Sequence, residues 1–256
     1  MAHVENIWVY PIKGLDATGI DAAAITEAGT LAGDREYAMT DDDGEALNGK
    51  RIDDVHEISS KFDPETDVLT VSVREIGETR QFDLTAERDE ASEWFSDFLG
   101  EPIEVCRRGP PGFVDRPTLG PSVISTGTLE EVSSWFDGMS PDGARRRLRP
   151  NVEIGGVPAF WEDRFLDEDR TGFEIGGVRF EAGEACGRCV IPSRDPDTGE
   201  PIEGFRRRFV QRREETLPEW VETGTFEHFY TVMLIAKVPE SHRGGTIEVG
   251  DDVRKA

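Results

Sequence analysis

The stretch Ala185-Cys186-Gly187-Arg188-Cys189, followed six residues later by Asp195-Pro196-Asp197-Thr198-Gly199, is the most informative part of this sequence. It places an arginine beside a thiol in a chain with three cysteines. A neighbouring cation favours the thiolate, the form of cysteine that binds metals and attacks electrophiles. The second segment predicts a turn, because aspartate side chains bond nearby backbone amides and glycine permits a positive φ. Cys189 is therefore the first candidate for chemistry, with Arg188 beside it.

The residues alone leave four interpretations of the Cys186-x-x-Cys189 pair open. A structural zinc site normally needs four ligands, and the remaining pool is Cys106 and four histidines without paired spacing. A thioredoxin-type pair stands at the start of a helix, yet Val190-Ile191-Pro192 follows here. Two inert buried thiols and a single functional thiolate are the other interpretations.

The composition is strongly acidic. Fifty-three Asp and Glu residues against 29 Lys and Arg give a formal net charge of −24, and only 5 of the basic residues are lysines. Such a surface repels nucleic acid and anionic membranes, so neither is expected as a partner. Concentrated salt relieves this self-repulsion, because the Debye length falls to about 3 Å at 1 M. We therefore expect a halophilic protein in a high-salt cytoplasm.

Targeting segments and disulfides are not expected. The sequence has no apolar run of about 18 residues that could span a membrane. Its first residues lack the basic and apolar regions of a signal peptide. An odd number of cysteines argues against a disulfide framework. These features predict a soluble, cytoplasmic protein.

The pattern of apolar runs and turn signals predicts a β-dominated α+β protein with two domains, residues 1–100 and 101–256. Helical spacing of apolar residues is found over 87–99, ending at Gly100, and over 205–213. Thr128 and Glu131 predict a capping box for a further helix. Strands are expected at 7–12, 37–40, 68–73, 122–125, 152–154, 173–175, 178–180, 230–236 and 246–249.

Three further motifs extend the pattern of the cysteine segment: Val9-Tyr10-Pro11-Ile12-Lys13, Gly33-Asp34-Arg35 and Arg147-Leu148-Arg149-Pro150-Asn151. Together the motifs cover nearly the whole chain and resemble the MOSC family, which includes molybdenum cofactor sulfurases and the mitochondrial amidoxime-reducing component. The resemblance implies an N-terminal β-barrel-like domain followed by a MOSC β-barrel domain.

The resemblance also implies a pocket for the molybdenum cofactor, a molybdenum centre held by a pterin that ends in a phosphate. Cys189 occupies the position of the protein ligand to molybdenum, whereas Cys186 matches a cysteine that is not the ligand. The other implied cofactor-binding residues are Lys13, Arg35, Ser125, Thr126, Arg149, Asn151 and Arg188. The sequence departs from the family pattern at Gly14, where serine is common, and at Phe229, where an aromatic hydroxyl is expected; His228 or Tyr230 is its expected substitute.

The function that the resemblance implies is a molybdenum cofactor-dependent oxidoreductase that reduces N-hydroxylated or related N-oxo or S-oxo small molecules. No ferredoxin-like cysteine cluster is present in the sequence, so we expect an external electron donor of ferredoxin or flavoprotein type. The alternatives are a sulfur-carrier or cofactor-delivery protein that uses Cys189, and a cofactor storage protein. A pyridoxal phosphate association through Lys13 is a further expectation. The basic stretch 205–213 indicates either a docking surface for an acidic donor or a solvated ion-pair network.

Overall fold

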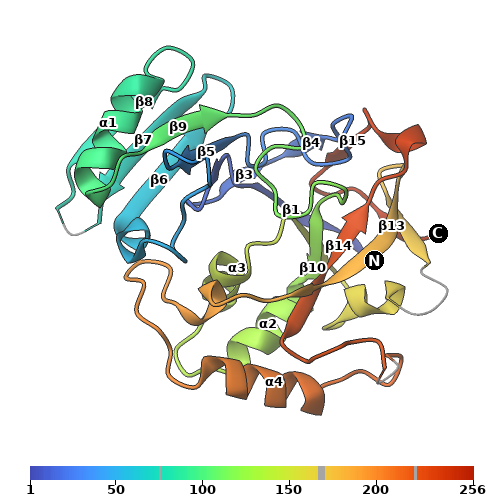
Figure 1. The fold of residues 1–256 in the computed structure, drawn as a ribbon. Helices are drawn as coiled ribbons and strands as arrows, with labels where there is room; N and C mark the ends of the chain where they lie inside the picture. Colours follow the sequence, from blue (N-terminus) through green and yellow to red (C-terminus); the bar gives the residue numbers. More distant parts are fainter. Residues whose placement is uncertain (75, 167–170, 222–223) are drawn as a thin grey trace.

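The largest sheet of the molecule contains strands from both halves of the chain (Figure 1). A computed structural model describes residues 1–74, 76–166, 171–221 and 224–256. Its eight-stranded sheet has the order β16-β12-β13-β14-β10-β11-β1-β3, in which the pair β10 and β11 is parallel. The strands are β1 His3–Val9, β3 Thr18–Ile20, β10 Ser122–Ser125, β11 Val152–Gly155, β12 Gly172–Ile175, β13 Val178–Gly187, β14 Thr231–Lys237 and β16 Val253–Lys255.

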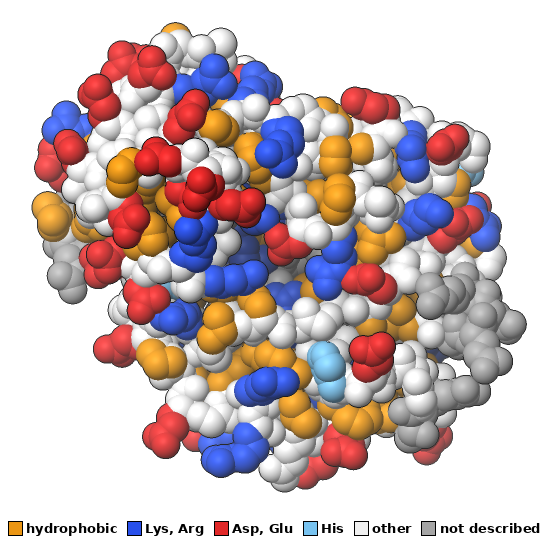
Figure 2. Space-filling view, viewed as in Figure 1, with side chains coloured by type: hydrophobic (Ala, Val, Ile, Leu, Met, Phe, Trp, Pro, Cys, Tyr) orange, Lys and Arg blue, Asp and Glu red, His pale blue; other side chains and the backbone are white. Residues whose placement is uncertain are grey.

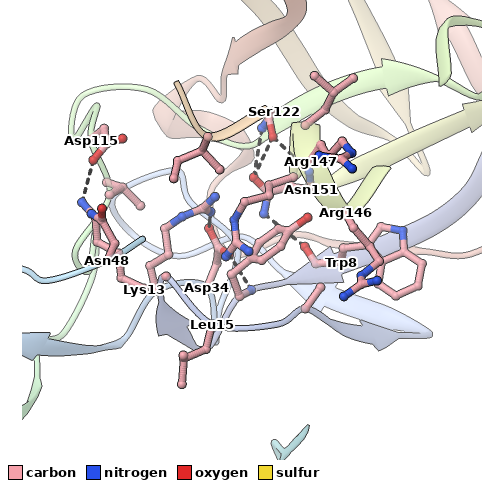
Figure 3. A pocket seen from close by; sticks show the side chains of 18 of the residues that line it. Trp8, Lys13, Leu15, Asp34, Asn48, Asp115, Ser122, Arg146, Arg147 and Asn151 are labelled. Carbon is pink, nitrogen blue, oxygen red and sulfur yellow. Dashed lines mark hydrogen bonds and ion pairs between the residues drawn. The ribbon is translucent and has the colours of Figure 1, made fainter. Parts of the chain in front are cut away.

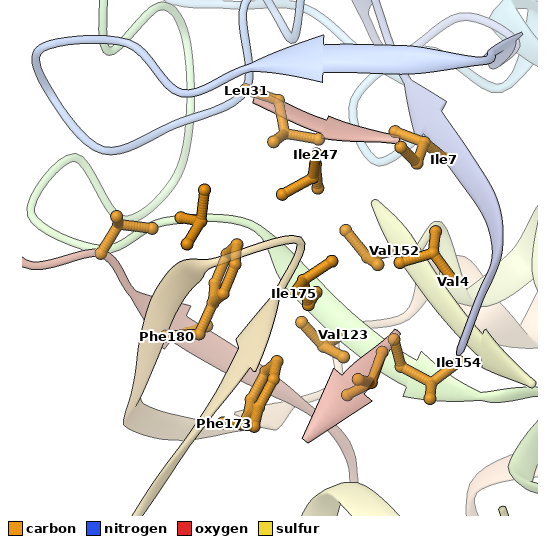
Figure 4. Packing of buried hydrophobic residues seen from close by; sticks show 14 of the residues in the cluster. Val4, Ile7, Leu31, Val123, Val152, Ile154, Phe173, Ile175, Phe180 and Ile247 are labelled. Atoms are coloured by element: carbon orange, nitrogen blue, oxygen red, sulfur yellow. The ribbon is translucent and has the colours of Figure 1, made fainter. Parts of the chain in front are cut away.

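The core of this sheet consists of aliphatic and aromatic side chains, which β-branched and aromatic residues supply to a pleated surface. Every residue of β10 and β11 is buried, as is typical of central strands. Figure 4 shows Val123 and Val152 of these strands close to Ile175 and Phe180 from the outer strands. Phe173 and Phe180 stack with ring centroids 5.4 Å apart. Burial of these side chains is the main force that holds the sheet together.

The N-terminal half adds two three-stranded sheets and one long helix. The order in one sheet is β2-β5-β9 and in the other β6-β7-β8, and helix α1 packs beside them (Figure 1). Helix α1 ends at Gly100 with a φ of 70°, as predicted from the glycine. A further pair joins β4 to β15. The bounds are β2 Ile12–Lys13, β4 Ala22–Ala24, β5 Tyr37–Thr40, β6 Ile58–Asp63, β7 Val68–Val73, β8 Thr79–Asp83, α1 Arg88–Leu99, β9 Glu104–Arg107 and β15 Thr246–Glu248.

The prediction of a β-dominated α+β fold is confirmed, but in the described residues the expected barrel-like domains do not form closed barrels. Their sheets have free edges and do not close on themselves. The reason lies in β1 and β3, which hydrogen-bond into the sheet of the second half and leave the remaining N-terminal strands in separate ladders. The expected strand 7–12 is also interrupted, since Pro11 has no N–H to continue a ladder.

Within its described residues, the second half carries three α-helices, α2 Thr126–Ser134, α3 Pro141–Leu148 and α4 Phe205–Glu215, together with three of the four short 3-10 helices described in the chain. The predicted cap of α2 is wrong. Ser125 is the cap, because its side chain accepts a hydrogen bond from the Thr128 backbone N–H, while Glu131 accepts one from the Trp135 indole. The 3-10 helices are η1 Asp53–Glu57, η2 Trp161–Phe165, η3 Ile191–Ser193 and η4 Glu240–His242. Within the described ranges, the helices are all too short or too polar to cross a bilayer.

Candidate functional site

A cavity of about 480 Å³ lies where the N-terminal half meets the second half. Its walls are strongly basic: among the described residues, ten that line it are Lys or Arg and three are Asp. In a chain with a net charge of −24, this cavity concentrates positive charge. Figure 2 shows blue side chains around a hollow near the middle of one face. The cations are Lys13, Arg35, Lys50, Arg116, Arg145, Arg146, Arg147, Arg149, Arg188 and Arg194.

Tyr10 organises two of the expected cations inside the cavity. The guanidinium of Arg149 lies 4.0 Å from the centre of its ring, and that of Arg35 lies 4.9 Å from it. The Tyr10 hydroxyl donates to the carbonyl of Pro150 at 3.0 Å, and desolvation raises the pKa of Tyr10 to about 12. This ring therefore remains neutral and supports both arginines through cation–π contacts.

Arg149 differs from Arg35 in its charge partners. Arg35 forms an ion pair with Asp34. The guanidinium of Arg149, by contrast, makes no hydrogen bond or ion pair with any described residue, and burial lowers its pKa. A desolvated cation without a counter-charge is a favourable binding group for an anion, because five N–H donors remain available.

The backbone holds these two arginines in a left-handed conformation, with φ of 54° at Arg35 and 58° at Arg149. Such a conformation costs a non-glycine residue on the order of 1–3 kcal/mol. Arg149 tolerates it as the residue that ends α3, just before Pro150. Arg35 is held because its N–H donates to Tyr10 and its carbonyl accepts from Phe113. Gly112 packs so closely there that a Cβ would lie 2.6 Å from the Arg35 carbonyl oxygen.

Lys13 reaches the cavity from β2 and forms an ion pair with Asp115 at 2.6 Å. An ion-paired ammonium is not a free amine nucleophile, so this geometry does not favour a Schiff base with pyridoxal phosphate. The next residue, Gly14, has a φ of 98°, and a Cβ there would lie 3.1 Å from the Cβ of Asn48. The departure from serine at position 14 thus has a conformational reason.

The two cysteines of the C-x-x-C pair lie in different environments. Both line the cavity, but Cys189 is exposed, whereas Cys186 is buried and packs in the core at the end of β13. Arg188 precedes Cys189 in the sequence, but its guanidinium contacts the sulfur of Cys186. Its Nη1 lies 3.1 Å from the Cys186 Sγ, and its Nη2 donates to the Leu148 carbonyl. The Tyr230 hydroxyl donates to the Cys189 carbonyl at 2.9 Å. Tyr230 therefore supplies an aromatic hydroxyl beside the position of Phe229.

A zinc site finds no support in the described part of the chain, which holds no cluster of three or more His, Cys, Asp or Glu side chains suited to a metal ion. Cys189 thus reaches the cavity without other protein groups that would complete a tetrahedral site.

The turn predicted at 195–199 is confirmed. The Asp195 side chain accepts from the N–H groups of Asp197 and Thr198, and Gly199 has a φ of 73°. Arg146 of α3 donates to both carboxylate oxygens of Asp197, at 2.8 and 2.5 Å, and Arg147 pairs with Asp195 at 3.0 Å. Helix α3 therefore holds the segment that follows Cys189.

The same turn joins the two halves of the molecule. Arg74, just after β7, lies 2.9 Å from Asp197, and Arg194 lies 2.9 Å from Asp53 of η1. His56 packs against Gly199, where a Cβ would lie 3.1 Å from its ring. Burial, followed by the charge of Arg194, lowers the pKa of His56.

Asn151 lines the cavity, but its amide is largely satisfied within the protein. Its Oδ1 accepts from the N–H and hydroxyl of Ser122, and its Nδ2 donates to the Trp8 carbonyl (Figure 3). These bonds fasten β10 and β11 to β1, so the observed contacts of Asn151 position the wall.

Ser125 and Thr126 are not brought to the cavity with the other expected residues. Both lie where β10 runs into α2, and Ser125 is fully buried, where its hydroxyl donates to the Pro158 carbonyl. Ser122 lines the cavity instead. Side chains alternate between the faces of a strand, so residues three apart point to opposite faces.

Several lining residues escaped the sequence reasoning, among them Asn48, Lys50, His56, Arg116 and Arg194. The turn-like Asn48-Gly49-Lys50 was the one signal that could have drawn attention to them. Buried side-chain nitrogens without a hydrogen-bond partner occur among the described cavity residues at Nε of Arg147, Arg188 and Arg194 and at Nε2 of His56. One accessible thiol, a guanidinium without a counter-charge and unpartnered donors suit a ligand that combines a soft metal with anionic groups.

Comparison with known proteins agrees with this geometry. Residues 1–102 match the MOSC N-terminal beta barrel domain, and residues 122–254 match the MOSC domain. The chain is 26% identical to mitochondrial amidoxime reducing component 2 of Bos taurus over 98% of this chain and 82% of that protein.

Two other relatives show the range of names in the family. Human mitochondrial amidoxime reducing component 2 is 25% identical, over 77% of this chain and 68% of its own length. The molybdenum cofactor sulfurase of Oryza sativa is 21% identical over 78% of this chain, which corresponds to 29% of the sulfurase. The resemblance seen in the sequence is thereby confirmed, and the chain belongs to the MOSC family, with a MOSC N-terminal domain ahead of its MOSC domain.

Proposed function

We propose that this protein is a molybdenum cofactor-dependent reductase of N-hydroxylated compounds or related N-oxo and S-oxo small molecules. The observation that carries the proposal is the exposed Cys189 thiol at the wall of a cavity that ten of the described cationic residues line. The amidoxime reducing components, which match 98% of the chain in the bovine case, support the choice of reaction.

The cavity residues would share the work of holding the cofactor. Cys189 would supply the soft sulfur ligand to molybdenum, and Arg149 would donate to the terminal phosphate with Arg35 and Lys13 nearby. When bound, the cofactor would supply a metal centre that accepts the oxygen atom of the substrate and gives up two electrons, which an external donor replaces. Arg146 and Arg147 keep the Cys189 segment in place through Asp197 and Asp195.

The overall reaction needs two electrons and two protons. The N–O bond of an amidoxime breaks, the oxygen leaves as water, and the product is the amidine. We propose that the electrons come from an external donor of ferredoxin or flavoprotein type, and that the substrate is a small molecule that enters the cavity.

The experiment is a matched pair of cysteine variants. Cys189→Ser is expected to lose bound molybdenum and to lose the reduction of amidoximes with reduced viologen as the electron donor. Cys186→Ser is expected to retain both and to lose roughly 1–2 kcal/mol of stability, because its buried sulfur packs in the core. Molybdenum per chain, measured by mass spectrometry, is the primary readout. Equal metal content in the two variants would refute the ligand assignment.

A sulfur-carrier function is the second candidate, favoured by the exposure of Cys189 and by the molybdenum cofactor sulfurase relative. In that case a cysteine desulfurase persulfide would transfer its outer sulfur to the Cys189 thiol, leaving the desulfurase as a thiol. The product would show a mass increase of one sulfur atom that Cys189→Ser abolishes. Accumulation of this persulfide by metal-loaded protein that does not reduce amidoximes would replace the first proposal.

A further inference from the structure

We propose that the exposed face of α4 is the docking surface for an acidic one-electron carrier protein. The inference rests on the proposed reductase function, which requires external electrons. Arg206, Arg207 and Arg208 begin this helix, and all three are exposed. None of them pairs with a carboxylate among the described residues, whereas fifteen other arginines in the same part of the chain do so within 4.0 Å.

The absence of internal partners argues against a solvated ion-pair network at these three positions. In a chain with 53 acidic residues, a run of arginines without described carboxylate partners keeps its positive potential for an outside partner. The network interpretation holds only one turn later, where Arg212 pairs with Glu215 at 3.1 Å. The first turn of α4 is therefore the part of the helix suited to docking.

The patch lies close to the candidate molybdenum ligand. The guanidinium of Arg206 lies 5.3 Å from the centre of the Tyr230 ring, and the Tyr230 hydroxyl donates to the Cys189 carbonyl at 2.9 Å. One side chain thus connects the arginine patch to the cysteine segment. Figure 2 shows Lys and Arg side chains over α4 on the same face as the basic hollow.

The surface has the mixed character of a transient protein contact. A shallow depression on α4 is lined by Arg206, Arg207, Val210, Gln211 and Glu214. Val190, directly after Cys189, is 49% exposed and adds an apolar side chain near the cavity wall. Small interfaces of this kind suit electron-transfer encounters, in which a carrier must leave after delivery.

Charge also determines how the partner is oriented. An acidic carrier is attracted to the arginines of α4 and repelled by the predominantly acidic remainder of the molecule, so the encounter is guided to the face that holds the cavity. A [2Fe–2S] carrier gives up one electron per encounter, so reduction of one amidoxime to an amidine and water needs two encounters and two protons from solvent.

The test uses a reduced plant-type [2Fe–2S] ferredoxin as the probe, with the full-length metal-loaded protein. Arg207→Glu combined with Arg208→Glu is expected to raise the Kd for ferredoxin about tenfold or more at low ionic strength. The matched control is Arg80→Glu with Arg254→Glu, which makes the same change in charge at exposed positions outside α4. The control should bind ferredoxin like the wild type, and salt should weaken wild-type binding more than that of the α4 variant.

Turnover separates this inference from the proposed function. The α4 variant should keep its viologen-driven amidoxime reduction, its metal content and its melting temperature, while its KM for ferredoxin rises with the Kd. If the wild type reduces no amidoxime with viologen, the proposed function fails. If viologen supports turnover but the α4 variant and its control have the same Kd and KM for ferredoxin, only the docking surface is refuted. The docking surface for an acidic carrier would also be refuted if the wild type binds single-stranded RNA and the α4 variant does not, while both bind ferredoxin equally well.

Discussion

Helices α3 and α4 are both rich in arginine, yet they use the guanidinium groups in opposite ways. On α3, Arg146 and Arg147 pair with aspartates of the turn that follows Cys189 and line the cavity. On α4, Arg206–Arg208 face solvent without described carboxylate partners, while Arg213 is fully buried against Asp163. The same residue type thus builds a wall, presents a surface or fills a core, depending on what the fold places opposite it.

The buried end of α4 gives the largest expected effect. Arg213→Leu should lower the free energy of unfolding by about 3–5 kcal/mol, because it leaves Asp163 buried without its counter-charge. Urea unfolding measures the change. The control is the exposed neighbour Arg212→Leu, expected to cost less than about 1 kcal/mol. Similar losses in both variants would show that burial of Arg213 does not make its ion pair more important for stability than that of the exposed Arg212.

The buried carboxyl beside this pair gives a pH dependence. Burial, with the nearby charge of Asp163, raises the pKa of Glu162 to about 8 from 4.5. The folded state then holds a proton that the unfolded state has released, so this group lowers stability as pH rises from about 4.5 to 8. Glu162→Gln should remove that decline and gain stability on the order of a few kcal/mol at pH 8. Melting temperatures across this range test it, and parallel curves would contradict it.

The ion pairs of α3 should behave in the opposite sense. Hydrogen bonds from Arg146 lower the pKa of Asp197, so its contribution is present above pH 3.8, the ordinary value, and is lost as pH falls through the lower folded value. Arg146→Gln should cost about 1 kcal/mol at pH 7, since both partners are partly exposed. The loss should shrink on acidification. A cost that is independent of pH would indicate packing instead of charge.

Arg149 gives the smallest expected effect on stability. Arg149→Gln should change the free energy of unfolding by less than about 0.5 kcal/mol, because the lost cation–π contact with Tyr10 is offset by the removal of a buried charge that has no described ion pair. Cofactor retention should nevertheless weaken by about 1–3 kcal/mol, since an anionic group loses its donor. Molybdenum release after dilution, compared with the melting temperature, separates the two effects. A large loss of stability with normal retention would place Arg149 among the structural arginines.

Much of the secondary structure could be predicted because local signals agree with the final packing. The strands at 37–40, 68–73 and 122–125 and the helix that ends at Gly100 coincide with β5, β7, β10 and α1. Helix α3 could not be predicted from apolar spacing, because its sequence is mostly polar. Its buried residues are Ala144, Arg147 and Leu148, of which only two are apolar. The full length of β13 was missed because 181–187 is rich in alanine, glycine and glutamate.

For the candidate site, too, some features follow from the sequence motifs and others depend on the fold. In the structure one cavity is lined by Lys13, Arg35, Arg149, Asn151, Arg188 and Cys189. Their ligand roles, the electron donor, the compartment and the adaptation to salt stay predictions. Arg188 contacts Cys186, and Ser125 and Thr126 lie outside the lining of the cavity, because strand register and the start of α2 determine which way a side chain points.

By itself, the sequence determined the family, the β-dominated fold class and the C-x-x-C pair with Arg188 between its cysteines, since these depend on residue type and spacing. Only the tertiary structure decided that Arg188 contacts Cys186 while Cys189 stays exposed. It also decided that the arginines of α3 pair with the turn at 195–199, while three arginines of α4 have no described carboxylate partner. The physical reason is that burial and charge pairing are set by residues far apart in the chain, such as Arg74 and Asp197 or Arg213 and Asp163. A linear pattern does not carry those distances.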